Sequence, residues 1–245
     1  MDALGDLVAR SRRSEESALL APGENRTYDY HRFCTTAWKT GNFWRRRGVH
    51  DEATVAVADD PEPEVVFSFF GAALLGARTR FGLPDPAAED LDARIAVAPA
   101  DEIGDYEVPP GTQRVGYGGP PDDPAVAHFE RDVWSENPSF PETPIDPGTV
   151  ALVAGEAEFS HADLLSAARE VADDWGLEPG DEVAVRAPLA DPGTVVAGIV
   201  APLLAGAAIL LPDEDSVGDF GVVAGSGDSD GGVPESETVE ASAVI

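Results

Sequence analysis

The sequence predicts an α/β protein built from two similar units, each a mainly parallel sheet covered by helices. The first observation behind this prediction is an internal repeat. Val55–Val57 matches Val183–Val185, and Gly76-Ala77 matches Gly206-Ala207 in the same order. The second observation is that helical stretches alternate with short, uniformly apolar segments, a pattern typical of parallel strands buried on both faces.

Each unit is expected to run helix, apolar strand, apolar helix and short apolar strand. The opening helices are predicted over residues 29–47 and 161–175, where apolar side chains recur with the helical period. Ser160 and Asp163 have the spacing of a capping box, so the second of these helices is expected to begin directly after Ser160.

The chain divides into four predicted segments. They are a first α/β unit (1–90), an irregular connecting segment with short strands (91–148), a second α/β unit (149–224) and an acidic Gly/Ser-rich tail (225–245). Further strands are predicted at 93–98, 113–117, 149–154 and 219–224, and prolines separate many of the elements.

The composition indicates a folded protein adapted to high salt, of the haloarchaeal type. The formal net charge is −30, the hydrophobic content is 43%, and Lys39 is the only lysine beside fifteen arginines. At molar salt the Debye length is about 3 Å, so a dense carboxylate surface repels itself little. No basic stripe is available to displace phosphate counterions, which argues against nucleic-acid binding.

The sequence also argues against a metal site and against a membrane-spanning segment. Cys34 is the only cysteine and is expected to be a packed thiol, and the four histidines lack the spacing of a metal site, so no metal is expected. Residues 193–211 are uncharged enough for a membrane span, but their counterpart in the first unit carries charges. We therefore expect a buried helix and strand there, and a cytoplasmic protein.

Three stretches, taken together, resemble the N-terminal domain of the adenylate-forming ligases, the superfamily of acyl- and acetyl-CoA synthetases. They are Thr27-Tyr28 with the apolar elements that follow, the segment Trp134–Pro138, and Ser160–Leu165 with Leu203–Ala207. Their order and spacing match over roughly residues 15–212. The resemblance implies two similar α/β units of an incomplete large domain, and a function related to AMP-dependent synthetases.

The family's phosphate loop is missing from this sequence. The resemblance implies a Ser/Thr/Gly-rich loop ending in Pro-Lys-Gly after strand 149–154, whose N–H groups and lysine hold ATP phosphates. In this chain a short segment leads from that strand to the next helix without such a loop. The residues at this degenerate phosphate-loop position are Gly155, Glu156, Ser160 and His161. His161 is expected to be a helix-start residue. The family's substrate pocket survives as a remnant at Pro188, Leu189 and Asp191.

These departures predict a degenerate acyl-CoA synthetase-like protein without catalytic residues, non-catalytic alone, that acts by binding or assembly. The later family signatures also do not occur in the sequence. A homo-oligomer or a second protein chain is the expected partner. The alternative is the N-terminal component of a split acyl- or acetyl-CoA ligase completed by a second chain, and only then would ATP and CoA be expected as cofactors.

Overall fold

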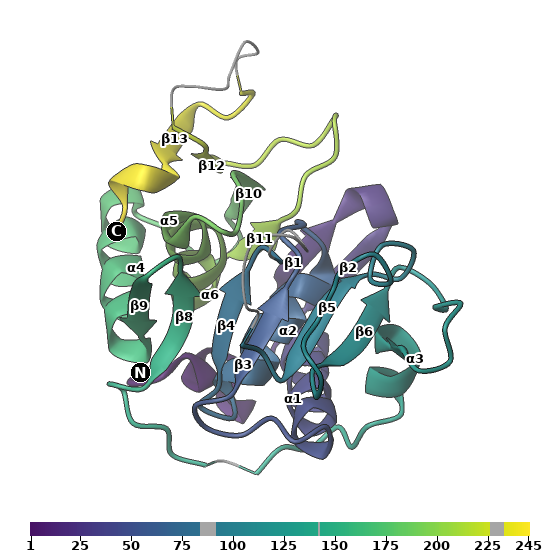
Figure 1. Ribbon diagram of the computed structural model, residues 1–245. Helices are drawn as coiled ribbons and strands as arrows, with labels where there is room; N and C mark the ends of the chain where they lie inside the picture. Colours follow the sequence, from purple (N-terminus) through teal and green to yellow (C-terminus); the bar gives the residue numbers. More distant parts are fainter. Residues whose placement is uncertain (84–91, 142, 226–232) are drawn as a thin grey trace.

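The computed structural model describes residues 1–83, 92–141, 143–225 and 233–245, and within them it has two sheets covered by helices (Figure 1). The seven-stranded sheet has the order β7 (Ala127–His128), β6 (Gln113–Tyr117), β5 (Ile95–Pro99), β3 (Thr54–Val57), β4 (Arg78–Phe81), β8 (Val150–Ala154) and β9 (Ala157–Ser160). The six-stranded sheet has the order β13 (Glu237–Glu240), β12 (Phe220–Val223), β10 (Glu182–Arg186), β11 (Ala208–Leu210), β1 (Ser17–Ala21) and β2 (Arg26–Asp29).

Both sheets are parallel except at one hairpin each. Strands β1 and β2 pair antiparallel in the six-stranded sheet, and β8 and β9 do so in the seven-stranded sheet. The central strands have apolar, buried middles, as at residues 95–98 of β5 and 183–185 of β10. The predicted α/β class, with mainly parallel sheets under helices, is confirmed.

The sheets do not follow the two halves of the chain, because the halves exchange their hairpins. Strand β1, from the N-terminal half, pairs parallel with β11 through Leu19 and Leu20. Strand β8, from the second half, pairs parallel with β4 through Leu152 and Val153. The predicted order of helix, strand, helix and strand is therefore incomplete, since a hairpin precedes the first helix of each unit.

Within the described residues, four α-helices and one composite helical segment cover the sheets. They are α1 (Tyr30–Arg46), α2 (Pro63–Ala73), α3 (Phe129–Trp134), α4 (His161–Trp175), and a segment made of α5 (Pro192–Thr194), a π-helical stretch (Val195–Val200) and α6 (Ala201–Ala205). Helix α2 packs on α1 and on strands β3 and β4, while the composite segment packs on α4 and β10. Each unit therefore has a long helix after its hairpin, α1 or α4, and a second helix or helical segment after its central strand (Figure 1).

The uncharged stretch 193–211 forms the composite helical segment and strand β11, as predicted, and its helical part is buried. No helix in the described ranges is long and apolar enough to cross a membrane. Cys34 is buried within α1, which agrees with the prediction of a packed thiol.

The structure adds detail within two of the predicted segments. Within the predicted tail 225–245, Glu237–Glu240 form β13 and pair in register with β12. Within the connecting segment 91–148, the predicted short strands form β5 and β6, which are inner strands of the seven-stranded sheet. Residues 84–90 of the predicted first unit and 226–232 of the predicted tail lie outside the described residues.

Candidate functional site

The position of the missing phosphate loop is a tight turn between β8 and β9. Ala154 pairs with Ala157, so only Gly155 and Glu156 connect the two strands. Gly155 has φ of 59°, a left-handed conformation that glycine adopts without steric cost. Residues Ala157–Ser160 then form strand β9, which leads directly into α4.

The side chains at this turn do not fit the phosphates of ATP. Glu156 is exposed, and Glu158 Oε1 lies 3.9 Å from Nη1 of Arg78 on β4. A two-residue turn offers too few N–H groups to surround a phosphate, and both carboxylates repel one. We therefore assign no ATP site to this turn.

Ser160 and His161 have structural roles at the start of α4. The Ser160 hydroxyl accepts a hydrogen bond from Asp163 N at 3.1 Å, and the Asp163 carboxylate accepts one from Ser160 N at 2.9 Å. This is the predicted capping box. His161 is fully buried, and its Nδ1 accepts a hydrogen bond from Leu4 N at 3.1 Å. Burial lowers the pKa of His161 to about 4, so its ring is neutral at pH 7.

The predicted pocket remnant, Pro188, Leu189 and Asp191, lies in the connection from β10 to α5. Leu189, which follows β10, donates from its N–H to Oδ1 of Asp59, which follows β3, at 2.6 Å. Asp191 caps α5 by accepting from Gly193 N at 3.0 Å. Leu189 is buried, and Pro188 precedes it, two residues after the end of β10. Leu189 therefore links the two sheets, while Asp191 has a local capping role.

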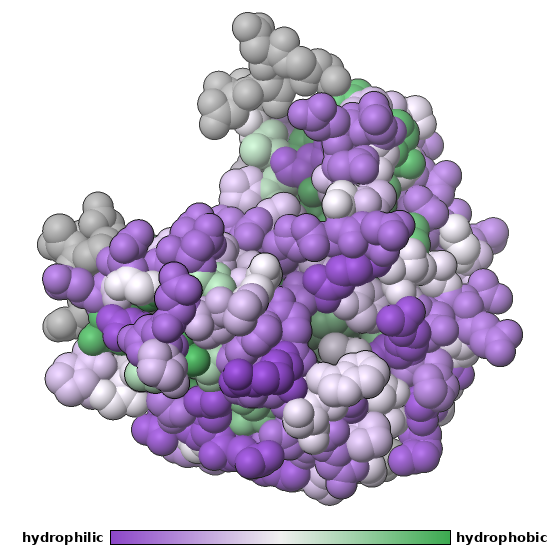
Figure 2. All heavy atoms as spheres, turned by 90° about the vertical axis from the view of Figure 1, so that its right-hand side faces the viewer, coloured by the Kyte–Doolittle hydropathy of each residue, from purple (hydrophilic) through white to green (hydrophobic). Residues whose placement is uncertain are grey.

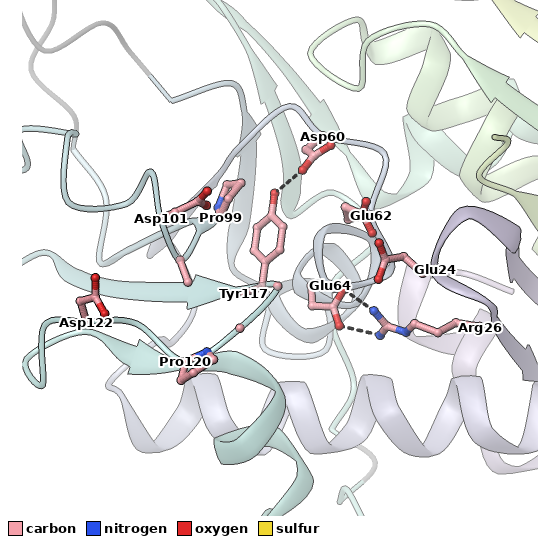
Figure 3. A pocket seen from close by; sticks show the side chains of 13 residues that line it. Glu24, Arg26, Asp60, Glu62, Glu64, Pro99, Asp101, Tyr117, Pro120 and Asp122 are labelled. Atoms are coloured by element: carbon pink, nitrogen blue, oxygen red, sulfur yellow. Dashed lines mark hydrogen bonds and ion pairs between the residues drawn. The ribbon is translucent and has the colours of Figure 1, made fainter. Parts of the chain in front are cut away.

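A cavity of about 450 Å³ opens at the carboxyl edge of the seven-stranded sheet (Figure 3). Its walls are the segments that follow β3, β5 and β6, together with the turn of the β1–β2 hairpin. Strand β3 continues to β4 on one side, while β5 lies on its other side. Such a switch in strand order is where open α/β sheets commonly bind ligands. We take this acidic pocket as the candidate site.

The pocket gathers carboxylates from segments far apart in the sequence. They belong to Glu24, Asp60, Glu62, Glu64, Asp101 and Asp122. The single guanidinium, that of Arg26, already binds Glu64 with both of its terminal nitrogens at 2.5 and 3.0 Å, as Figure 3 shows. Glu64 is only 3% exposed, so this ion pair forms part of the pocket wall.

Two groups in the pocket have raised pKa values. Burial, together with the neighbouring carboxylates of Glu24 and Asp60, raises the pKa of Glu62 to about 7. The Tyr117 hydroxyl donates a hydrogen bond to Oδ2 of Asp60 at 2.8 Å, and burial raises the pKa of this tyrosine well above its usual value. Glu62 is therefore about half protonated at neutral pH, whereas Tyr117 keeps its proton there.

The pocket therefore suits neither a phosphate nor a carboxylate ligand. Uncompensated carboxylates repel anions, and Arg26 is already paired. Across the described residues, no group of three or more His, Cys, Asp or Glu side chains is placed to hold a metal ion. Sequence analysis missed this pocket, and the signal available was the acidic run Asp59–Glu64 directly after a buried strand.

Comparison with known proteins finds similarity at the level of structure. No protein-family model and no curated protein matches the sequence. The structure superposes on the anthranilate CoA ligase AuaEII in complex with anthranoyl-AMP with a TM-score of 0.77 and 18% identity. The match covers 91% of this chain and 49% of that ligase.

Two further solved structures extend this similarity. A benzoate CoA ligase from Burkholderia xenovorans LB400 gives a TM-score of 0.74 at 17% identity, covering 90% of this chain and 50% of the ligase. The nonribosomal peptide synthetase FmoA3 gives 0.70 at 19% identity, covering 88% of this chain and 23% of the synthetase. This chain thus spans about half the length of the CoA ligases it matches. Its fold is that of the N-terminal domain of the adenylate-forming ligases, as the sequence resemblance predicted.

Proposed function

We propose that this chain is an acyl-CoA synthetase-like protein that does not adenylate carboxylic acids by itself and acts by binding or assembly. The observation that carries the proposal is the two-residue turn at Gly155 and Glu156, in the place where the resemblance implies a phosphate loop. Neither ATP nor CoA is expected to be a cofactor of the chain alone.

The physical reason lies in what adenylation requires. Phosphoryl transfer depends on donors and cations that stabilise the negative charge that develops on the phosphate oxygens. The β8–β9 hairpin supplies two carboxylates, Glu156 in the turn and Glu158 in β9, and Nη1 of Arg78 already lies 3.9 Å from Oε1 of Glu158. Lys39, the only lysine of the chain, lies in α1 and contacts Trp134.

An intact hydrophobic core supports a role in binding or assembly. Large side chains such as Trp44, Phe67 and Leu164 are fully buried, so the framework has kept its packing while the phosphate loop is missing. We expect the partner to be a second copy of the chain or another protein. In the alternative proposal, a second chain completes a split acyl-CoA ligase and supplies the phosphate-binding groups.

Pyrophosphate release separates these possibilities. The purified chain is incubated in molar KCl with ATP, Mg²⁺, CoA and a panel of carboxylic acids. An active CoA ligase in its own buffer serves as the control for the reagents. No release above background is expected from the chain alone. Turnover by the chain alone would overturn the proposal, and turnover that requires an added second chain would favour the split ligase.

A further inference from the structure

A second cavity, of about 490 Å³, lies between α1 and α3. We call it the α1–α3 groove and define it by Tyr28, Arg32, Lys39, Phe67, Phe129 and Trp134 among its lining residues. The chain is strongly acidic, yet α1 contains no Asp or Glu at all. In Figure 2, which views the molecule from the side on which α3 and β6 lie in Figure 1, hydrophilic residues dominate and apolar ones form small separate areas.

The cations of the groove are held by aromatic rings and carbonyl groups. Lys39 Nζ donates to the Trp134 carbonyl oxygen at 2.7 Å and lies 4.7 Å from the centre of its ring. The Arg32 guanidinium lies 5.3 Å from the centre of the Tyr28 ring and donates to Thr27 O at 3.0 Å. Within the described part of the chain, neither cation forms an ion pair.

The two carboxylates that border the groove already have partners. Glu64 binds Arg26 through both oxygens. Glu130 accepts a hydrogen bond from Gly118 N at 2.6 Å, and its other oxygen lies 3.1 Å from His128 Nε2. Neither carboxylate forms an ion pair with Arg32 or Lys39, so both cations remain available to an anion, in a protein of net charge −30.

Aromatic side chains form the apolar part of the groove. Phe67 and Phe129 are buried beneath it, whereas Trp134 is 80% exposed, the largest exposed fraction among the exposed large hydrophobic residues described. An exposed indole beside a concave apolar surface presents a flat face on which a planar ligand can stack. The volume is within the range of pockets that hold small molecules.

We propose that the α1–α3 groove binds a small amphipathic organic anion. Its flat apolar body lies against Trp134 and Phe129, and its single anionic head contacts Lys39, with Arg32 as a second cation of the same groove. Direct contact at hydrogen-bond distance is short enough to survive screening in molar salt, since the Debye length there is about 3 Å. This ligand site is independent of the proposed lack of adenylation.

Calorimetric titration in molar KCl tests the proposal with naphthoate, a planar aromatic carboxylate, and with naphthamide, its uncharged analogue. Saturable binding of naphthoate with one site per chain is expected. Naphthamide is expected to bind about tenfold more weakly, because it lacks the charge-assisted contacts. Lys39→Gln and Trp134→Ala are each expected to weaken naphthoate binding about tenfold.

Arg45→Gln is the matched control, because Arg45 is a cation of the same helix that lies over Phe140 and does not line the groove. Its affinity for naphthoate is expected to equal that of the unmodified chain. Thermal melting of each variant checks that it folds, and Lys39→Arg retains the charge and should retain binding. Absence of saturable naphthoate binding, equal affinity for naphthamide, or equal losses in Arg45→Gln and Lys39→Gln would overturn the proposal.

Discussion

Helices α1 and α4 occupy equivalent places in the two units, yet they differ sharply in charge. Each follows a β-hairpin and precedes a central strand, β3 or β10. Helix α1 carries four cationic residues and no acidic one, whereas α4 carries four acidic residues and one arginine. The fold is therefore compatible with either sign of charge on the exposed face of this helix.

The difference teaches where to look for function on an acidic protein. If the carboxylate surface is an adaptation to salt, then α4 shows the ordinary state of the surface and α1 departs from it. The departure coincides with the α1–α3 groove. The buried faces differ as well, since α1 buries aromatic side chains and α4 buries mainly leucine and alanine.

Substitutions in the buried faces of α1 and α4 are expected to have the largest effect on the free energy of unfolding. Trp44→Ala in α1 should lower the free energy of unfolding by about 4 kcal/mol, and Leu164→Ala in α4 by about 3 kcal/mol, because both side chains are fully buried and the indole leaves the larger cavity. Denaturant titration in molar KCl measures both, with the exposed Asp173→Ala as control. A larger loss for Leu164→Ala would show that the aromatic face of α1 is less well packed.

The first residues of the two helices predict different responses to pH. Tyr30 begins α1 and donates its hydroxyl to Ala207 O at 2.7 Å, whereas His161 begins α4 and is buried as a neutral ring. Burial lowers the pKa of His161 from 6.5 to about 4. Its unfolded form therefore binds a proton more readily, and stability should fall by up to about 1.4 kcal/mol per pH unit below pH 6.5.

This pH dependence has a direct control. His161→Asn keeps an acceptor for the N–H of Leu4 and removes the titrating ring. Unfolding midpoints measured from pH 7 to pH 5 should decline less steeply in His161→Asn than in the unmodified chain. Equal slopes for the two proteins would mean that other groups cause the decline.

Substitutions of exposed charged residues in α1 and α4 are expected to have the smallest effect on stability. At low salt, Asp174→Arg in α4 should stabilise the protein by about 0.5 kcal/mol, and Arg45→Glu in α1 should destabilise it by a similar amount. Both changes should become neutral in molar KCl, where screening shortens the range of exposed charges. Thermal melting at several KCl concentrations tests this, together with the expectation that the unmodified chain itself is more stable in high salt.

The sequence predicted those elements that are marked by a local pattern, such as a short apolar run or a helix-capping residue. Strand β6 occupies the predicted residues 113–117, and α4 begins directly after the predicted capping residue Ser160. The exchanged hairpins could not be predicted in this way, because the partners of β1 and β8 are remote in sequence. Strand β13 was missed because Glu237–Glu240 is mostly exposed and lacks an apolar pattern.

The candidate pocket was harder to predict than the missing loop. The loop is a local feature, and the absence of a lysine and of a Ser/Thr cluster between Ala154 and Ser160 is visible in the sequence. The acidic pocket forms from segments between Glu24 and Asp122 that meet only through the sheet. Its carboxylates are ordinary surface residues in a sequence with 46 of them.

Equilibrium binding of Mg²⁺-ATP tests the central claim most directly. The claim is that the two-residue turn at Gly155 and Glu156 cannot hold the phosphates of a nucleotide. Calorimetric titration of the purified chain with Mg²⁺-ATP in molar KCl is predicted to give no saturable heat, either for the unmodified chain or for Glu156→Ala. Saturable binding of Mg²⁺-ATP to the unmodified chain would contradict the account.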